Sequence, residues 1–279
     1  MLYVYLIASA ALVPILNNFY PILKTDKSWW LVPVLFIGFF LCFLILHIGI
    51  FALSILFVNK DKEYDNPSKY YRFIVKMTLP LIFKLGRVDI KVTGEEKLPE
   101  NRKVMLVSNH IHDFDPAVII SSFPDLQLGF IAKKEVYTLF PFVAKLMARL
   151  DCLPIDRENN REGVKAILKA VGYIKSGRAS IGIFPEGYTS KDGELQEFRN
   201  GAFKIATRSK APIVVCTLVN SDKIVKNMFR RKTTVYLDVL EVIEPTEFEG
   251  IHTDVIGERV HKEMKENIAK RRESDSPDN

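Results

Sequence analysis

The sequence predicts an α/β protein, with a mixed, mostly parallel β-sheet flanked by helices and an N-terminal transmembrane helix or helical hairpin. Short β-branched runs alternate with stretches of helical periodicity from Val88 onward, and a long uncharged segment precedes them. The composition, 48% hydrophobic and 26% charged with 14 Gly and 14 Pro, excludes collagen-like and wholly disordered chains. One globular domain with a membrane appendage is therefore expected.

The first 59 residues form the predicted membrane segment. The stretch from Leu31 to Val58 has no charged side chain, and a bilayer core needs about 20 such residues in a helix. Trp29 and Trp30 precede this stretch and the polar run from Asn59 to Lys62 follows it, as is typical of residues at the membrane interface. We therefore expect this segment to span a bilayer.

A second N-terminal span is the open alternative. Leu2 to Leu23 is also uncharged, and the turn from Lys24 to Ser28 is short enough to join two antiparallel helices. A signal peptide is disfavoured because Met1 to Tyr5 contains no Lys or Arg. The charges that flank the spans are few and similar, so the positive-inside rule gives little help with orientation.

The three cysteines, Cys42, Cys152 and Cys216, are too few and too scattered for a disulfide framework. They indicate a reducing compartment. We expect the domain that follows the membrane segment to face the cytoplasm.

Residues 60–262 are predicted to form the α/β domain. The expected strands are Val88–Val92, Val104–Ser108, Leu128–Ala132, Ser180–Phe184, Ile213–Leu218 and Val235–Val242. The expected helices between them are Pro116–Ser122, Glu135–Leu150, Arg161–Ser176 and Phe198–Ser209. Residues 263–279 are rich in charge and are predicted to be a disordered tail. No phosphate-binding loop of the Walker type and no dinucleotide fingerprint is present in the sequence.

The densest group of catalytic residue types runs from Ser108 to Pro116, where a predicted strand gives way to a helix. Sites in open α/β sheets form at the carboxyl ends of strands. A tight turn can bring the His110 ring onto the carboxylate of Asp115, which makes His110 a candidate general base and Asp115 its orienting acid. The simpler interpretation of Asp115, followed by Pro116, is an N-cap that stabilises the helix by about 1 kcal/mol.

A metal site is the main competing hypothesis for this segment. His110, His112, Asp113 and Asp115 supply two imidazoles and two carboxylates, and a metal-dependent hydrolase could use such a set. Zinc sites usually need a further well-placed ligand, and the remaining histidines show no ligand spacing. We therefore predict no metal.

Two further segments have the character of a site. Glu186 and Gly187 lie in a Pro-Glu-Gly turn after a β-rich run, although such a turn is common. Arg157 follows a short apolar segment and could hold a phosphate with two hydrogen bonds. Taken alone, Arg157 is also compatible with a surface ion pair.

Four blocks of this sequence together resemble the glycerolipid acyltransferases. The blocks are Asn109-His110 to Asp115, Leu153-Pro154-Ile155-Asp156-Arg157, Phe184-Pro185-Glu186-Gly187 and Ala211-Pro212-Ile213-Val214. Their order and spacing make the resemblance specific, and it covers roughly residues 88–219. Weaker support comes from Ala132-Lys133-Lys134-Glu135 and from the segment 198–203.

The resemblance implies transfer of an acyl group from acyl-CoA or acyl carrier protein to the hydroxyl of a lysophosphatidate-type acceptor, without a cofactor. It also implies site roles. His110 would be the base and Asp115 its orienting partner. Arg157 would bind phosphate, and Glu186, Gly187, Lys133 and Asn109 would shape the substrate site. Because both substrates are amphiphiles, an enzyme that joins them works best at a membrane interface.

The sequence departs from the family pattern at one position. The third block usually continues Gly-Thr-Arg-Ser, whereas here Thr189 stands where the phosphate-contacting Arg is expected. Lys133, Lys191 or Arg199 could supply the missing cation. The acceptor head group is therefore the least determined property.

A non-catalytic membrane-binding module is the remaining alternative. The net charge of +6 and the helical pattern from Tyr70 to Leu85 would suit anionic lipid. Nucleic acid is not an expected partner, because the positive charge is spread along the chain and no base-reading motif occurs.

Overall fold

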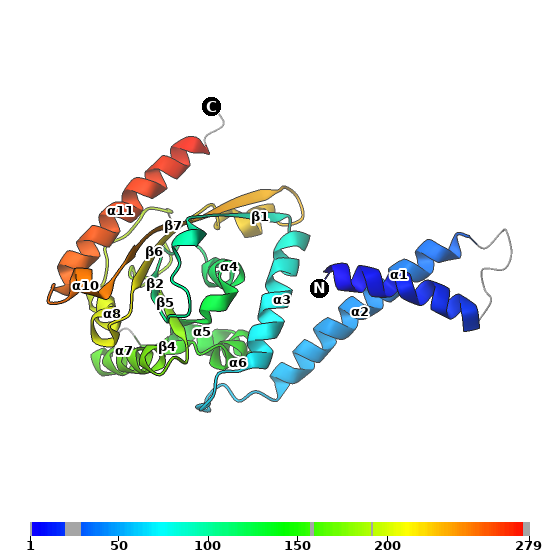
Figure 1. The fold of residues 1–279 in the computed structure, drawn as a ribbon, viewed down its shortest axis with the longest axis horizontal. Helices are drawn as coiled ribbons and strands as arrows, with labels where there is room; N and C mark the ends of the chain where they lie inside the picture. The colour runs from blue at the N-terminus through cyan, green and yellow to red at the C-terminus, as the bar shows by residue number, and fades with distance from the viewer. Residues whose placement is uncertain (1, 20–28, 157–158, 191, 276–279) are drawn as a thin grey trace. The chain divides into compact units, whose positions relative to one another are not determined.

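The computed structural model describes residues 2–19, 29–156, 159–190 and 192–275 (Figure 1). The chain divides into two compact units, Met1–Val58 and Asn59–Asn279. The first unit corresponds to the expected membrane segment and the second to the expected α/β domain with its C-terminal extension.

The first unit is a helical hairpin of α1 (Leu2–Phe19) and α2 (Leu31–Leu56). Tyr5 of α1 stacks on Phe43 of α2, with ring centroids 6.1 Å apart, so the start of α1 lies beside the middle of α2. Among the described residues, α2 is the one helix long and apolar enough to cross a membrane, with a mean hydropathy of 2.8, whereas the apolar part of α1 is shorter.

The described part of the second unit contains one seven-stranded sheet, in the order β1-β7-β6-β2-β5-β3-β4. Its strands are β1 (Val88–Thr93), β2 (Met105–Val107), β3 (Leu128–Lys133), β4 (Leu153–Ile155), β5 (Ser180–Ile183), β6 (Ile213–Val219) and β7 (Thr233–Ile243). Every neighbouring pair is parallel except β6 and β7. The predicted mixed, mostly parallel sheet is confirmed.

The topology places five strand ends at one edge of the sheet. Strands β6, β2, β5, β3 and β4 all run in the same direction, so the loops that follow them lie along a common edge. Strand β4 is absent from the sequence prediction because it is three residues long, lies at the end of the sheet and contains Pro154, which cannot donate a ladder hydrogen bond.

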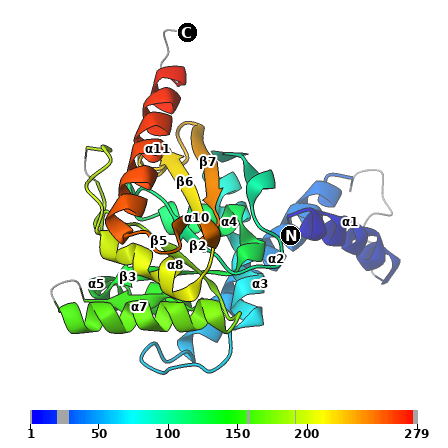
Figure 2. The ribbon, with the colours of Figure 1, turned by 60° about the vertical axis from the view of Figure 1, so that its left-hand side comes forward.

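Helices cover both faces of this sheet. The main ones are α3 (Lys69–Leu85), α4 (Asp115–Ser122), α5 (Lys134–Leu139), α6 (Pro141–Arg149), α7 (Asn160–Lys175), α8 (Lys204–Ser209), α9 (Lys223–Asn227), α10 (Pro245–Phe248) and α11 (Thr253–Ser274). Buried residues of α7, α8 and α11 join the inward side chains of β2, β5 and β6 in one apolar core. Figure 2 shows these three helices in front of the sheet.

Two helical predictions need correction. The single helix expected over 135–150 is broken into α5 and α6, because Pro141 has no N–H to continue α5 and begins the next helix instead. The disordered tail expected from residue 263 is wrong as far as Ser274, since α11 continues to that residue. Met264 and Ile268 of α11 are buried, and Arg271 pairs with Asp238 of β7. The last four residues of the expected tail lie outside the described ranges.

Candidate active site

The site is built at the common edge of the sheet, from the loops that follow β2 and β5. These strands are neighbours in parallel register, so His110 after β2 and Glu186 after β5 come close together. The backbone N–H of Ser190 donates to the carbonyl of His110 over 2.8 Å. The two loops are therefore fastened to each other at His110 itself.

His110 and Asp115 form a hydrogen-bonded pair. His110 Nδ1 lies 2.9 Å from Asp115 Oδ2, and the exposed fractions of the two side chains are 15% and 0%. A carboxylate accepts hydrogen bonds, so this contact assigns the proton of the neutral ring to Nδ1. Nε2 is then left with a lone pair that can accept a proton.

Four donors hold the Asp115 carboxylate. Oδ2 also accepts from the backbone N–H groups of Ile111 and His112, at 2.7 and 2.9 Å, and Oδ1 accepts from the hydroxyl of Ser221. Asp115 is the first residue of α4, but its side chain turns back onto the preceding loop and makes no cap on the helix. The N-cap interpretation is therefore wrong, and the carboxylate serves as a rigid support for the ring.

Ser221 is a member of this network that the sequence reasoning missed. It follows the end of β6, which lies beside β2 in the sheet. Ser221 is therefore close to Asp115 in space, although the two residues are far apart in the sequence. The one available signal was its position directly after a buried β-branched run, at the same sheet edge.

The other side of the His110 ring faces a hydroxyl group. Thr189 Oγ1 lies 3.0 Å from His110 Nε2, and with the proton on Nδ1 the threonine hydroxyl donates to Nε2. Phe184 stacks on the imidazole with ring centroids 4.2 Å apart and planes inclined by 11°. The ring is thus fixed in position, with its basic nitrogen directed at an alcohol.

Glu186 holds the backbone of the His110 loop by hydrogen bonds. Its Oε1 accepts from the backbone N–H of His110 at 2.6 Å, and its Oε2 accepts from the backbone N–H of Gln196 at 2.9 Å. Burial raises the pKa of Glu186 to about 7, although both hydrogen bonds favour the charged form. The Glu186 carboxylate is therefore directed into the protein, where it holds the backbone of His110 in place.

Gly187 is required by its backbone and by its surroundings. Its φ of +83° is in the left-handed region, and a Cβ at this position would lie 2.9 Å from Nε of Arg199. The Arg199 side chain therefore lies directly over the Pro-Glu-Gly turn. Among the described residues its guanidinium has no hydrogen-bond or ion-pair partner.

The remaining predicted substrate-binding residues are placed differently from one another. Asn109 is buried, and its carboxamide is occupied by the backbone of Leu218, with Nδ2 to O at 2.9 Å and N to Oδ1 at 2.7 Å. It fastens the loop to β6, and this geometry gives no support to substrate binding. Lys133 ends β3 at the same sheet edge and pairs with Glu135 at 3.2 Å. Arg157 and Lys191 lie outside the described residues.

The four proposed metal ligands do not converge. His110 Nδ1 is turned to Asp115, whereas His112 Nδ1 accepts from the backbone N–H of Phe114 at 3.2 Å. Within the described ranges no three His, Cys, Asp or Glu side chains are grouped so that they could hold a metal ion. Of these four residues, His110 and Asp115 instead have the geometry of a proton-transfer pair.

Comparison with known proteins identifies the family. The acyltransferase family model matches residues 89–219, which include the loops after β2, β4 and β5. A 1-acyl-sn-glycerol-3-phosphate acyltransferase of Borreliella burgdorferi is 30% identical over 186 residues, covering 64% of this chain and 73% of that protein. A probable enzyme of the same name from Mycoplasma genitalium is 32% identical over 201 residues, or 68% of each chain. This chain belongs to the acyltransferase family.

The fold of the acyltransferase agrees with a solved structure. The crystal structure of the lysophosphatidate acyltransferase PlsC from Thermotoga maritima superposes with a TM-score of 0.59 and 22% sequence identity, covering 81% of this chain and 89% of that one. The expectations of an α/β fold and of membership in the acyltransferase family are confirmed.

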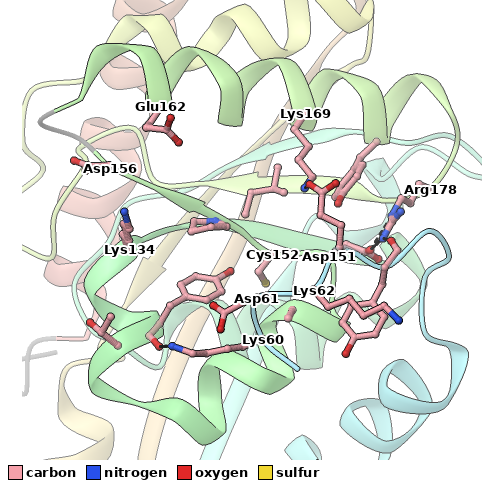
Figure 3. A pocket seen from close by; sticks show the side chains of 18 residues that line it. Lys60, Asp61, Lys62, Lys134, Asp151, Cys152, Asp156, Glu162, Lys169 and Arg178 are labelled. Carbon is pink, nitrogen blue, oxygen red and sulfur yellow. Dashed lines mark hydrogen bonds and ion pairs between the residues drawn. The ribbon is translucent and has the colours of Figure 1, made fainter. Parts of the chain in front are cut away.

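A separate hollow of about 360 Å³ lies between α5, α7 and the segment that follows residue 59 (Figure 3). Both charge signs line it and neutralise each other. Asp151 pairs with Arg72 and with Arg178, each at 2.7 Å, and Lys169 pairs with Glu63. His110 is not among its lining residues. The hollow therefore marks where the N-terminal part of the second unit is fastened to the domain.

Proposed function

We propose that this acyltransferase moves a fatty acyl group from an acyl thioester, carried by CoA or acyl carrier protein, to the sn-2 hydroxyl of lysophosphatidate, giving phosphatidate. His110 acts as the general base, and Asp115 orients it. The observation that carries the proposal is the arrangement of one ring, with Nδ1 on a buried carboxylate and Nε2 on an alcohol. The acceptor is inferred from the names of the relatives from Borreliella and Mycoplasma.

The chemistry needs one transfer step. The acceptor hydroxyl takes the place of the Thr189 hydroxyl at Nε2 and gives its proton to the ring as its oxygen attacks the thioester carbonyl carbon. The C–S bond of the tetrahedral intermediate then breaks, and the leaving thiolate takes the proton back from Nε2. An ester and a thiol result, and His110 returns to its starting form.

The buried carboxylate contributes to this step through position and charge. Four hydrogen bonds fix Asp115 before substrate binds, so it need not reorganise when the ring becomes an imidazolium. General-base catalysis of this kind contributes about 10² to 10⁴ in rate.

The site of action follows from the substrates and from α2. Lysophosphatidate and long-chain acyl groups are amphiphiles, and α2 has the length and hydropathy of a membrane span. We place the enzyme in the membrane with its α/β domain on the cytoplasmic side, where acyl-CoA and acyl carrier protein are found.

The test is an acylation assay on the full chain reconstituted in lipid vesicles. His110→Ala should lower kcat by about 10² to 10⁴ with either thioester donor. His112→Ala is the matched control, because it keeps the backbone N–H that donates to Asp115 and removes only a ring that packs on Phe114, and it should retain activity within about tenfold. A His110→Ala enzyme that acylates lysophosphatidate at the wild-type rate would refute the mechanism.

An acceptor panel in the same assay tests the substrate. Lysophosphatidate should be acylated in preference to lysophosphatidylcholine, lysophosphatidylethanolamine and monoacylglycerol. Preference for an acceptor without a terminal phosphate would leave the acyl-transfer mechanism intact and overturn the assignment of the acceptor.

A further inference from the structure

The connection between β6 and β7 carries an exposed aromatic ring among basic residues. Residues 223–232 of this connection include five Lys or Arg and no Asp or Glu. Phe229 is 73% exposed, and its φ of +64° lies in the left-handed region, which bulky residues rarely adopt. Val225 of α9 is 53% exposed. The backbone is therefore strained at the residue that presents the ring to the outside, and such strain is concentrated at functional segments.

The end of α3 extends this surface. Ile82 and Leu85 of α3 are 42% and 53% exposed. A Cβ added to Gly86, directly after the helix, would lie 3.8 Å from Cγ of Met228. The end of α3 and the β6–β7 connection are therefore neighbours at the start of β1 (Figure 1), and their exposed apolar side chains belong to one part of the domain surface.

This surface lies at the same sheet edge as the catalytic pair. Strand β7 is antiparallel to β6 and parallel to β1, so β6 ends where β7 and β1 begin. The backbone N–H of Thr233 donates to the carbonyl of Arg87 over 3.0 Å, which fastens the two approaches to this edge. Ser221, whose hydroxyl donates to Asp115, comes two residues before α9. The surface and the support of the His110 ring are thus consecutive parts of one connection.

The charges of the connection suit anionic lipid. Lys223, Lys226 and Lys232 each pair with an aspartate, at 3.8, 3.6 and 2.8 Å. Arg230 and Arg231 are exposed, and no acidic side chain in the described ranges pairs with either guanidinium. Guanidinium groups match phosphate oxygens with paired hydrogen bonds. A bilayer with anionic lipid offers phosphates to the arginines and acyl chains to the apolar side chains between them.

We propose that this basic edge surface, formed by residues 82–87 and 223–232, docks on anionic phospholipid headgroups and inserts the Phe229 ring among them. Its partner is a bilayer that contains anionic phospholipid. The inference rests on the proposed function for its consequence, since the acceptor there is itself a lipid. It adds that docking holds the sheet edge of His110 and Asp115 against the headgroup layer, so acyl transfer depends on anionic lipid.

Tryptophan fluorescence tests the contact without any turnover, since Trp29 and Trp30 are the chain's two tryptophans. The full chain carrying Trp29→Phe, Trp30→Phe and Phe229→Trp is reconstituted in vesicles of phosphatidylcholine and phosphatidylglycerol, with bromine on the acyl chains of part of the lipid. The new tryptophan should emit at shorter wavelength and be quenched by the brominated lipid, and both effects should be lost without phosphatidylglycerol. The matched control is Val255→Trp, because Val255 is 56% exposed and follows the opposite end of β7. It should remain unquenched.

Three results would overturn the proposal. Emission at position 229 that matches the Val255→Trp control would show a solvated ring. A blue shift without quenching by brominated lipid would mean that another protein chain covers the ring. Quenching that is equal with and without phosphatidylglycerol would remove the role assigned to the arginines. If position 229 is quenched while no acyl acceptor is turned over, the proposed function fails and the lipid surface stands.

An activity measurement tests the arginines separately. At fixed lysophosphatidate, adding phosphatidylglycerol to phosphatidylcholine vesicles should raise wild-type acylation by about tenfold, whereas Arg230→Gln with Arg231→Gln should reduce this rise to less than about twofold. The control is Lys175→Gln with Arg208→Gln, which removes the same charge from exposed positions before β5 and β6, at the opposite edge. It should keep the wild-type rise.

Two outcomes of this assay would contradict the proposal. The first is a double-arginine variant that responds to phosphatidylglycerol as the wild type does. The second is a loss of activity confined to the acyl carrier protein donor and equal in both kinds of vesicle, which would assign the surface to an acidic protein partner.

Discussion

The two halves of the active-site sheet edge differ in how completely they are organised. In the half formed by β2, β5 and β6, His110, Asp115, Glu186 and Ser221 all have hydrogen-bond partners, and Asp115 and Ser221 are fully buried. In the half formed by β3 and β4, Lys133 is half exposed and pairs with an exposed Glu135.

The difference has a physical reason. A base must keep one tautomer and one orientation through the reaction, which requires buried partners in fixed positions. A cation that binds a phosphate gains its strongest partner only when the ligand arrives, and an exposed ion pair contributes little before then. We therefore propose that the buried half performs the proton transfer, and that the exposed half and Arg199 select the head group.

Replacing the Asp115 carboxylate in the organised half should have the largest effect on activity. Asp115→Asn puts an amide N–H among groups that already donate, so the Nδ1 contact is lost or reversed and the imidazolium loses its negative partner. We expect kcat to fall by about 10² to 10⁴ with a much smaller change in KM. Steady-state kinetics on the purified, vesicle-reconstituted variant measure this.

Ser221→Ala is the matched control for that variant. It removes the donor to Oδ1 but keeps the contact between Oδ2 and the ring, so kcat should fall by less than about tenfold. If the two variants lose activity equally, the network acts through the stability of the loop and not through the ring. Circular dichroism on both checks that each is folded.

Neutralising Arg199 should show whether the exposed half binds the phosphate of the acceptor. Thr189 stands in place of the family arginine, and the Arg199 side chain lies against Gly187 in the neighbouring Pro-Glu-Gly turn. A charge-assisted contact to phosphate is worth about 1.5 to 3 kcal/mol, so Arg199→Gln should raise the KM for lysophosphatidate by about tenfold to a hundredfold, with kcat nearly unchanged. Kinetics at varied acceptor concentration separate the two constants.

The control for Arg199 is Arg208→Gln, which removes an exposed arginine of α8. It should leave the KM within about twofold of the wild-type value. An Arg199→Gln variant whose KM is unchanged, with Lys133→Gln raising it instead, would move the phosphate to the β3 side of the edge.

The smallest expected effect concerns Glu186, which holds the backbone of His110, and is an effect on the free energy of unfolding. Burial raises the pKa of Glu186 to about 7, so between its ordinary pKa and 7 the folded chain keeps a proton that the unfolded chain has lost. Glu186 therefore makes the free energy of unfolding decrease as pH rises through this window, and the loss is complete above about pH 7. Glu186→Gln should abolish this decrease, gaining about 1 to 3 kcal/mol relative to wild type between pH 5 and pH 8.

Urea denaturation of the detergent-solubilised full chain at several pH values provides the measurement. Glu197→Gln, which changes an exposed carboxylate of the same loop, should show no comparable trend. A pH-independent difference between Glu186→Gln and wild type would mean that Glu186 is ionised throughout the range.

Much of the architecture could be predicted because it depends on local pattern. Alternating runs of β-branched and helical periodicity required the α/β class, and the uncharged stretch required α2. The charged C-terminus was mispredicted for a related reason. Ile256, Val260, Met264 and Ile268 are spaced four apart and all buried, but this single apolar stripe is obscured by the many charges around it.

The pairing of His110 with Asp115 could be inferred from sequence because one tight turn joins them. The partners that complete the site come from distant parts of the chain, and their proximity depends on strand order. Ser221 reaches Asp115 because β6 lies beside β2, and Thr189 reaches His110 because β5 lies on the other side.

By itself, the sequence determined the α/β class, the apolar span and the chemical character of the His110 loop, since each depends on residues that are neighbours along the chain. Only the tertiary structure decided what faces Nε2, that Asn109 is turned onto β6, and that Arg199 lies over Gly187. Such contacts follow from the order of strands in a sheet, which is selected by packing the whole core and is not encoded in any one segment.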